Sequence, residues 1–198
     1  MCAGIGDFLG NGNSDILWQN NDGQAAIWLM NGTTLVGGSG VAIGPNLGPS
    51  WHVVGTGDFH DGGAPAINPS TLSAGMPAPQ MSFVATDVAG TTEPAGVFDS
   101  DILWQNNDGQ AQIWLMNGSD VVSMVTVGQA LGPTWHIVDT GDFNRDGNSD
   151  ILWQNNNGQA QIWLMNGTKV VSEELAGGVN GPTWHAIATG DFHGGSAA

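Results

Sequence analysis

Tryptophan recurs along this chain at a spacing that few folds accommodate. Trp104 and Trp153 are 49 residues apart, two further tryptophan pairs repeat this interval, and an earlier copy supplies three more. The three sets are Trp18, Trp28 and Trp51; Trp104, Trp114 and Trp135; and Trp153, Trp163 and Trp184. Internal repeats of about 20 to 50 residues are typical of solenoids and propellers. We therefore expect one supersecondary unit to be built three times.

Each copy carries the signals of four short strands. DILWQN is a short apolar run, NDGQ or NNGQ is an Asp-Gly or Asn-Gly turn, and AQIWLMNG is a second strand that ends in another Asn-Gly turn. A third run such as SDVVSMVTVG follows, and WHIVDTGDF leads into the next copy. Four strands in about 49 residues is the unit of a propeller blade. The sequence thus predicts an all-β fold of propeller-type blades, each with four antiparallel strands.

The repeats also predict how the chain is divided. Residues 1–59 hold the first repeat and the leading strand of the next, residues 60–98 interrupt the pattern, and residues 99–198 hold two further repeats that end in a terminal strand. The interruption opens with a Pro- and Gly-rich stretch that excludes a regular central strand. Its segment 81–88, MSFVATDV, has the pattern of a replacement first strand. The alternative is that all of 60–98 lacks regular structure.

The charge of the chain excludes several classes of partner. Lys169 and Arg145 are the only bases against 18 acids, which gives a net charge of −16. Repulsion of this size weakens a compact state unless cations neutralise it, and it argues against nucleic acid and anionic membranes. The chain has no apolar run long enough for membrane insertion and no signal peptide. We expect an extracellular or cell-surface location, with the export signal outside this chain.

The loop DFNRDGNSD is the strongest candidate for a site. It places oxygen-bearing side chains at its first, third, fifth, seventh and ninth positions and a glycine at its sixth. Calcium takes six to eight oxygen ligands at about 2.3–2.6 Å, and alternate residues of a tight loop can supply them. The alternative is a series of Asx turns to the local backbone. The expected calcium ligands are Asp142, Asn144, Asp146, Asn148 and Asp150. By analogy with other loops of this spacing, Asn148 is expected to contribute its backbone carbonyl more than its side chain.

The other copies of this loop are less complete. In the first, Leu9 occupies the third position and two carboxylates remain, so this weaker site should hold a divalent ion less well. Its expected ligands are Asp7, Asn11, Asn13 and Asp15. In the second copy the interruption separates Asp58 from Asp101, and we expect no complete site there.

The repeats resemble the FG-GAP/VCBS repeats of integrin-α-like β-propellers, in the Trp-rich form found in bacterial extracellular proteins. The resemblance rests on a G-D-F triplet, followed by the pattern D-x-N-x-D-G-x-x-D and then by a hydrophobic strand. The resemblance covers three near-complete copies, most of the chain outside 60–98. It implies that the loop joins the first two strands of a blade and binds calcium through Asp142, Asn144, Asp146 and Asp150. The chain departs from the family in its interruption, its degenerate first loop and its small number of blades.

Tryptophan and glutamine together suggest a ligand surface. An indole face stacks on the C–H groups of sugars while amides bind hydroxyl groups, whereas the alternative is that the tryptophans fill the space between blades. The residues expected to bind a ligand are Trp28, Trp114, Trp163, Gln112 and Gln161.

These observations favour a noncatalytic, calcium-stabilised extracellular module for binding or adhesion, with glycans or a cell-surface protein as partner. The sequence has no G-x-S-x-G motif, and Cys2 is its single cysteine. The main alternative is a structural protein that assembles with other copies of itself into a ring or filament, by pairing the strand edge at 184–192. A third is an accessory domain of a secreted hydrolase.

Overall fold

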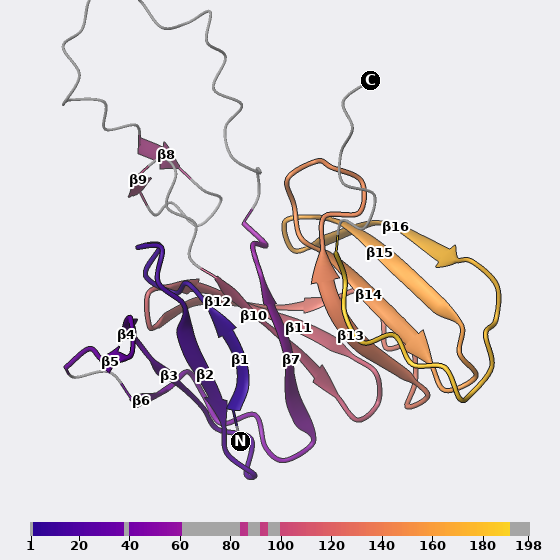
Figure 1. The fold of residues 1–198 in the computed structure, drawn as a ribbon, viewed down its shortest axis with the longest axis horizontal. Coiled ribbons are helices and arrows are strands. Elements are labelled where there is room, and N and C mark those ends of the chain that lie inside the picture. The colour runs from indigo at the N-terminus through magenta and orange to yellow at the C-terminus, as the bar shows by residue number, and fades with distance from the viewer. Residues whose placement is uncertain (1, 38–39, 61–83, 87–91, 95–99, 191–198) are drawn as a thin grey trace, which may run out of the picture.

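The computed structural model describes residues 2–37, 40–60, 84–86, 92–94 and 100–190 of the 198-residue chain. In these residues the regular structure is entirely β, as predicted. Three four-stranded antiparallel sheets lie side by side, and two two-stranded ribbons accompany them (Figure 1). We call the sheets blade 1, blade 2 and blade 3 in chain order.

Each blade is built from strands in nearly consecutive order. Blade 1 contains β1 (Cys2–Gly6), β2 (Asp15–Gln19), β3 (Ala25–Trp28) and β6 (Val41–Ile43). Blade 2 contains β7 (Trp51–Gly57), β10 (Asp101–Asn106), β11 (Ala111–Asn117) and β12 (Asp120–Val127). Blade 3 contains β13 (Trp135–Gly141), β14 (Asp150–Asn155), β15 (Ala160–Asn166) and β16 (Lys169–Ala176). The predicted four-stranded antiparallel unit is confirmed. A ribbon of β4 (Met30–Asn31) and β5 (Thr34–Leu35) extends the β3–β6 connection of blade 1.

The turn chemistry of the repeat explains the sharp connection between the second and third strands. In blade 2, Asn106 N donates to Gln110 O at 2.9 Å, and Gly109 N donates to Asn106 O at 3.0 Å. Gly109 has a φ of 76°, and a Cβ at this position would overlap the carbonyl of Gly132. Glycine is therefore required twice over at this point of the NDGQ sequence.

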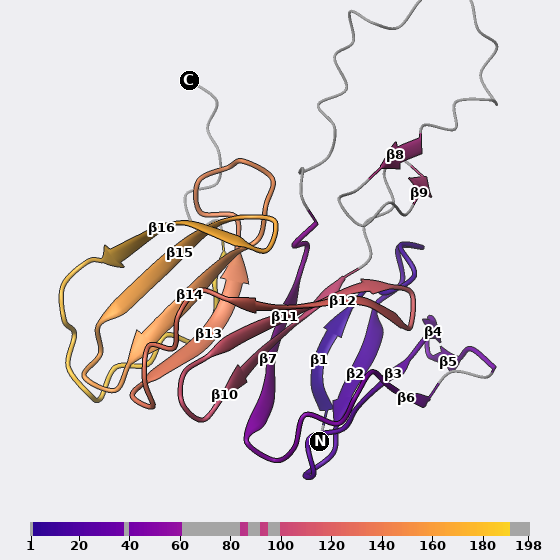
Figure 2. The same cartoon turned by 180° about the vertical axis from the view of Figure 1, so that it is seen from behind.

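The described residues of the interruption supply no strand to blade 2. β8 (Val84–Thr86) pairs with β9 (Thr92–Pro94), and this ribbon lies apart from the blades (Figures 1 and 2). The first strand of blade 2 is β7, which pairs with β10 from Asp101↔Gly57 to Asn106↔Trp51. The expected replacement strand at 81–88 is therefore wrong for its described part, because β7 already covers the whole length of β10. The alternative that all of 60–98 lacks regular structure is wrong for the two strands of the ribbon.

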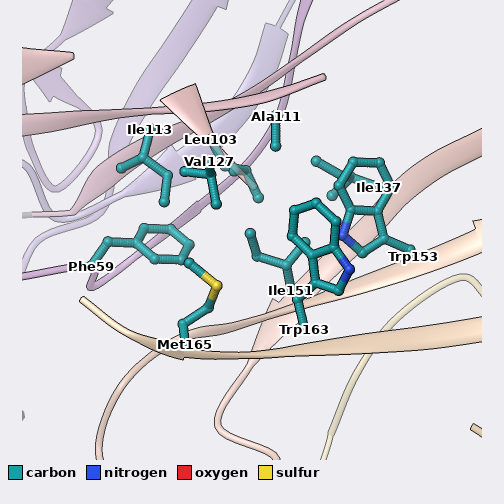
Figure 3. Close-up of a cluster of buried hydrophobic side chains, with 10 residues drawn as sticks. All are labelled: Phe59, Leu103, Ala111, Ile113, Val127, Ile137, Ile151, Trp153, Trp163 and Met165. Atoms are coloured by element: carbon teal, nitrogen blue, oxygen red, sulfur yellow. The ribbon is translucent and has the colours of Figure 1, made fainter. Parts of the chain in front are cut away.

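Two hydrophobic cores lie between neighbouring blades. The core between blades 2 and 3 includes Phe59 and Ile113 on one side and Trp153, Trp163 and Met165 on the other, all at most 1% exposed (Figure 3). An equivalent core between blades 1 and 2 contains Phe8, Trp104 and Trp114. Within each of blades 2 and 3, the two core tryptophans lie with ring centroids 4.8 Å apart. Because each core takes side chains from two blades, the blades stabilise one another.

A glutamine from each blade ties it to the next segment of the chain. Gln105 Nε2 in β10 donates to Trp135 O at 2.6 Å, and Gln105 Oε1 accepts from Ile137 N at 2.8 Å. Gln19 makes the same two bonds to Trp51 O and Val53 N, and Gln154 makes them to Trp184 O and Ala186 N.

The segment 184–190 occupies the place of a first strand beyond blade 3. It joins no sheet of the described chain, so the terminal strand expected from Trp184 is not formed as such. Thr189 Oγ1 nevertheless donates to Thr140 O at 2.7 Å. Thr140 Oγ1 donates to Thr56 O, and Thr56 Oγ1 to Ile5 O, each at 2.8 Å. The first strands of the three blades, β1, β7 and β13, and this segment are thus linked by the same hydrogen bond, from a threonine hydroxyl to a backbone carbonyl.

Candidate metal centre

The loop between β13 and β14 is closed by hydrogen bonds from its backbone to its own side chains. Asp142 Oδ1 accepts from Asp146 N at 3.1 Å, and Asp142 Oδ2 accepts from Gly147 N at 2.9 Å. Asn144 Oδ1 also accepts from Asp146 N, and Asp146 Oδ1 accepts from Asn148 N at 2.9 Å. These are the Asx turns of the alternative interpretation. They do not exclude a cation, because a carboxylate oxygen that accepts one hydrogen bond keeps a second lone pair.

Asn148 carries the most informative oxygen of this loop. Its side chain is 8% exposed, and its Oδ1 is buried without a hydrogen-bond partner. Its Nδ2 donates to Asp146 Oδ1 at 2.9 Å, so the amide lies beside an exposed carboxylate. An unsatisfied buried acceptor costs about 1–3 kcal/mol, and a cation held here would remove that cost.

Asp150, at the ninth position, has a structural role that the loop pattern did not reveal. It is fully buried, and its two oxygens accept from Phe143 N and Met165 N, each at 2.8 Å. Asp15 makes the same pair of bonds with Phe8 and Met30, and Asp101 makes it with Phe59 and Met116. The last aspartate of each loop therefore fastens the G-D-F turn to the end of the third strand or, in blade 1, to β4 just after it, and only its remaining lone pairs are left for a cation.

The middle and the last position of the loop differ in electrostatics. The N–H of Asn148 and the amide of Asn144 hold the pKa of Asp146 below its usual range. Burial raises the pKa of Asp150, against the opposing effect of its two backbone hydrogen bonds. Of these two carboxylates, Asp146 is the better suited to remain charged as a ligand.

The first loop keeps the backbone of the third but has fewer charges. Asp7 Oδ1 accepts from Asn11 N at 3.0 Å, Asp7 Oδ2 accepts from Gly12 N, and Asn11 Oδ1 accepts from Asn13 N at 2.9 Å. The fourth position is left-handed in both loops, with a φ of 59° at Gly10 and 63° at Arg145. The two loops thus share these turns, and they differ in the residues at the third, fourth and fifth positions.

The second blade contains a cluster that the sequence did not predict. Asp58 and Asp101, which the interruption separates in sequence, lie together beside His60. His60 Nδ1 is 3.2 Å from Asp101 Oδ2 and 3.7 Å from Asp58 Oδ1. The hydrogen bonds to Asp101 and then Asp58 raise the pKa of His60 to about 10, so its imidazole is protonated at neutral pH. The three groups could hold a metal ion, but the proton on the ring competes for the same space.

Two of the expected ligand-binding tryptophans are not accessible. Trp114 and Trp163 are 0% exposed within the cores between blades, so the prediction that they stack on a ligand is wrong. Their neighbours also have other partners: Gln112 Oε1 accepts from Trp114 Nε1, and Gln161 Nε2 donates to a glutamate of β16. Trp28 is 38% exposed, because no further blade covers this face of blade 1 in the described structure.

Grooves at the blade junctions present a different set of tryptophans. One, of about 420 Å³, is lined by His52, Gln105, Asn107, Trp135 and His136 among others. A second, of about 500 Å³, repeats this lining beyond blade 3 and ends at the exposed Trp184. Indole, imidazole and amide groups therefore meet in the same arrangement twice.

Within the described residues no helix reaches the length and hydrophobicity needed to cross a membrane. Comparisons of the chain with protein-family models, with curated proteins and with solved structures found no match.

Proposed function

We propose that this chain is a noncatalytic extracellular binding or adhesion module whose blades are stabilised by calcium at the loop 142–150. The observation that carries the proposal is the buried, unpartnered Oδ1 of Asn148, whose Nδ2 donates to Asp146 Oδ1. The loop offers oxygen ligands throughout, which is the chemistry that calcium selects. The resemblance to FG-GAP/VCBS repeats supports the same assignment.

The residues that would hold the ion are Asp142, Asn144, Asp146 and Asn148, with Asp150 secondary because two backbone amides already occupy its oxygens. When bound, calcium would neutralise the loop's carboxylates and tie its tip together. Most of the loop is exposed, so we expect weak affinity, in the range of about 10⁻⁴–10⁻³ M that extracellular modules show. Such affinity would suit a compartment rich in calcium.

The buried aspartates favour a noncatalytic role. Asp15, Asp101 and Asp150 each use both carboxylate oxygens to hold backbone amides, so removing any of them would disturb the fold first. A carboxylate pair for hydrolysis needs groups that are free to exchange protons with a substrate. This pattern makes the hydrolase-domain alternative the weakest of the three.

Calorimetric titration of the chelator-treated chain with CaCl2 tests the calcium assignment. We expect one weak site and a melting temperature that rises with calcium. At a calcium concentration a hundred times the dissociation constant, the free energy of unfolding should increase by about 2.7 kcal/mol. Asp146→Ala should abolish both effects. Asn11→Ala changes the same position of the first loop and serves as the matched control. Absence of binding heat and of any shift in melting temperature for the native chain would overturn the assignment.

A carbohydrate ligand is a second candidate, favoured by the two repeated grooves at the blade junctions. Their volumes fall within the usual range of small-ligand sites, about 300–1,000 Å³. Trp135 and Trp184 would supply the stacking faces, in place of the buried Trp114 and Trp163. Binding to a glycan array that Trp184→Ala weakens is the expected result. An array with no bound glycan would rule this candidate out.

A further inference from the structure

The outer face of blade 3 lacks contacts that the equivalent faces of blades 1 and 2 make. Phe8 and Phe59, of the first and second G-D-F turns, are 0% and 1% exposed. Phe143, of the third, is 40% exposed. In the first two cases the next blade covers the phenyl ring, and in the third no described residue takes that role.

The glycine that follows the outer strand is covered by the next blade in blades 1 and 2 but not in blade 3. At Gly44 and Gly128 a Cβ would lie 2.6 Å and 2.7 Å from the ring of the next blade's core tryptophan, Trp114 and Trp163 respectively. At Gly177, the equivalent residue of blade 3, no atom lies within 4 Å of that position. Blade 3 therefore presents a site for a tryptophan ring that no described residue of the chain fills.

Blade 1 presents the matching tryptophan. Trp28 occupies the position of Trp114 and Trp163 and is 38% exposed. Ser14 is also exposed. Its counterparts Ser100 and Ser149 each accept a hydrogen bond at Oγ from the backbone N–H of an aspartate in the preceding blade. The backbone N–H of each serine donates in turn to the carbonyl oxygen of the same aspartate. The outer faces of blades 1 and 3 are thus the two halves of the contact that occurs twice within the chain.

The same incompleteness appears in a histidine–asparagine pair. His52 Nε2 lies 3.0 Å from Asn107 Oδ1 in blade 2, and His136 Nε2 lies 2.9 Å from Asn156 Oδ1 in blade 3. Asn21 is the equivalent asparagine of blade 1, but β1 pairs with β2 only as far as Trp18 and brings no histidine to it. His185, in the segment 184–190, is the equivalent histidine without a described asparagine opposite.

We propose that two copies of this chain associate head to tail, the outer face of blade 3 of one packing on the outer face of blade 1 of the other. The segment 184–190 of the first copy then pairs with β2 of the second in place of β1. This brings His185 against Asn21, and Gly177 against Trp28. The inference goes beyond the proposed function, and it does not require calcium in the loop 142–150.

The strand exchange is favoured because β1 is a poor first strand. It covers β2 only from Asp15 to Trp18, whereas β13 covers β14 from Asp150 to Asn155. The segment WHAIATG at 184–190 has the length and pattern of WHIVDTG in β13. Placed on β2, it would add the two missing backbone pairs and the histidine.

The geometry of the repeat sets the expected size of the assembly. A head-to-tail contact between identical copies either closes a ring or continues as a filament. Two copies with three blades each make a ring of six, within the range of about four to eight blades that closed propellers use. We therefore expect a closed dimer of twice 20.4 kDa. Each copy carries a charge of −16, so moderate salt should strengthen the association.

Two substitutions separate the two halves of the contact without disturbing the single chain. Gly177→Asn blocks the outer face of blade 3, because its side chain enters the site for the tryptophan ring, while asparagine tolerates a φ of 63° and no described atom lies within 4 Å of its Cβ position. Ser14→Lys blocks the outer face of blade 1 at an exposed position. Circular dichroism melting of each variant confirms that it folds.

Sedimentation velocity in moderate salt, with and without chelator, then tests the proposal. We expect the native chain to have twice the mass of one copy and each variant alone to have the mass of one copy. An equimolar mixture should associate more than either variant alone, because one of its two contacts is unblocked: the blade 1 face of Gly177→Asn meets the blade 3 face of Ser14→Lys. A monomeric native chain, variants that remain dimeric, or a mixture with no more association than either variant alone would each overturn the proposal. The chelator arm separates this outcome from failure of the calcium assignment.

Discussion

His60 Nδ1 lies 3.2 Å from Asp101 Oδ2, at the third position of a loop that uses asparagine there in blade 3. Asp58 supplies a second carboxylate, at 3.7 Å from the same nitrogen. The protonated imidazole thus occupies the space between the first and last carboxylates of the loop. In blade 2 a side chain of the protein provides the positive charge that we assign to calcium in blade 3.

This arrangement predicts a loss of stability at alkaline pH. The pKa of His60 is raised from 6.5 to about 10 in the folded chain, first by Asp101 and then by Asp58. The folded state therefore binds a proton that the unfolded state has released above pH 6.5 or so, and the free energy of unfolding decreases with pH. The stabilisation is complete below about pH 6.5 and is lost as the pH rises through about 10. Urea unfolding at a series of pH values measures it.

His60→Gln is the variant that isolates this effect. Glutamine can still donate to Asp101 but carries no titratable charge, so the decrease between pH 6.5 and 10 should flatten. His52→Gln changes an exposed histidine that binds an asparagine, and it should keep the native slope. If both variants retain the native pH dependence, His60 is not the group responsible.

Removal of the buried carboxylate in the same cluster should be severe. Asp101→Ala leaves Phe59 N and Met116 N without acceptors in the interior and leaves His60 with one carboxylate fewer. Removing one partner of a buried charged pair costs about 3–5 kcal/mol. Asp15→Ala removes the equivalent carboxylate of blade 1, which accepts from two backbone N–H groups in the same way. Leu9 replaces the histidine there, so this substitution should cost less. Chemical unfolding of the two variants compares them, and equal losses would show that His60 contributes nothing.

The glycine after the outer strand provides a test of the packing between blades. Gly128→Ala would place a Cβ 2.7 Å from the ring of Trp163, at a backbone φ of 56°. Overpacking of a core costs about 1–3 kcal/mol, in addition to about 1–2 kcal/mol for the left-handed backbone. Gly177→Ala carries the backbone cost alone, because no atom lies within 4 Å. Thermal melting at dilute concentration should rank Gly128→Ala well below Gly177→Ala, and equal melting temperatures would contradict the described core.

The repeated elements could be predicted because their signals are local. Asn-Gly and Asp-Gly turns and short apolar runs mark the strand ends in each copy, and the structure places strands at those points. The spacing also identified which loop residues share one turn, since position in a tight loop is a matter of a few residues. Local patterns of this kind determine the backbone before any long-range contact forms.

The parts that could not be predicted depend on contacts between distant residues. His60 and Asp101 lie on opposite sides of the interruption, so nothing near either residue indicates the other. All three tryptophans of a repeat recur at fixed positions, and which of them is buried depends on which face the next blade covers. Trp28, Trp114 and Trp163 have the same place in the sequence repeat, yet Trp28 is exposed and the other two are buried. The difference comes from the packing of neighbouring blades, which the repeat pattern does not show.

The glutamine of each LWQN sequence gives the last prediction. Gln105 is 6% exposed and holds Trp135 O and Ile137 N, so Gln105→Met should leave Ile137 N buried and unpaired and Trp135 O without its partner at a part-buried position. An unpaired buried group costs about 1–3 kcal/mol, so we expect a loss of at least that size. Gln154 makes the same two bonds to the exposed segment beyond blade 3, where water can replace them, and Gln154→Met should cost little in dilute solution.

The two substitutions should also differ in how protein concentration affects them. If segment 184–190 becomes an internal strand of a dimer, the bonds of Gln154 become as buried as those of Gln105, and Gln154→Met then weakens the dimer. Its effect on melting temperature should therefore grow with concentration, while that of Gln105→Met should stay nearly constant because its bonds lie within one chain. Melting curves over a wide range of concentration measure both. A Gln154→Met effect that is independent of concentration would argue against burial of this segment between copies.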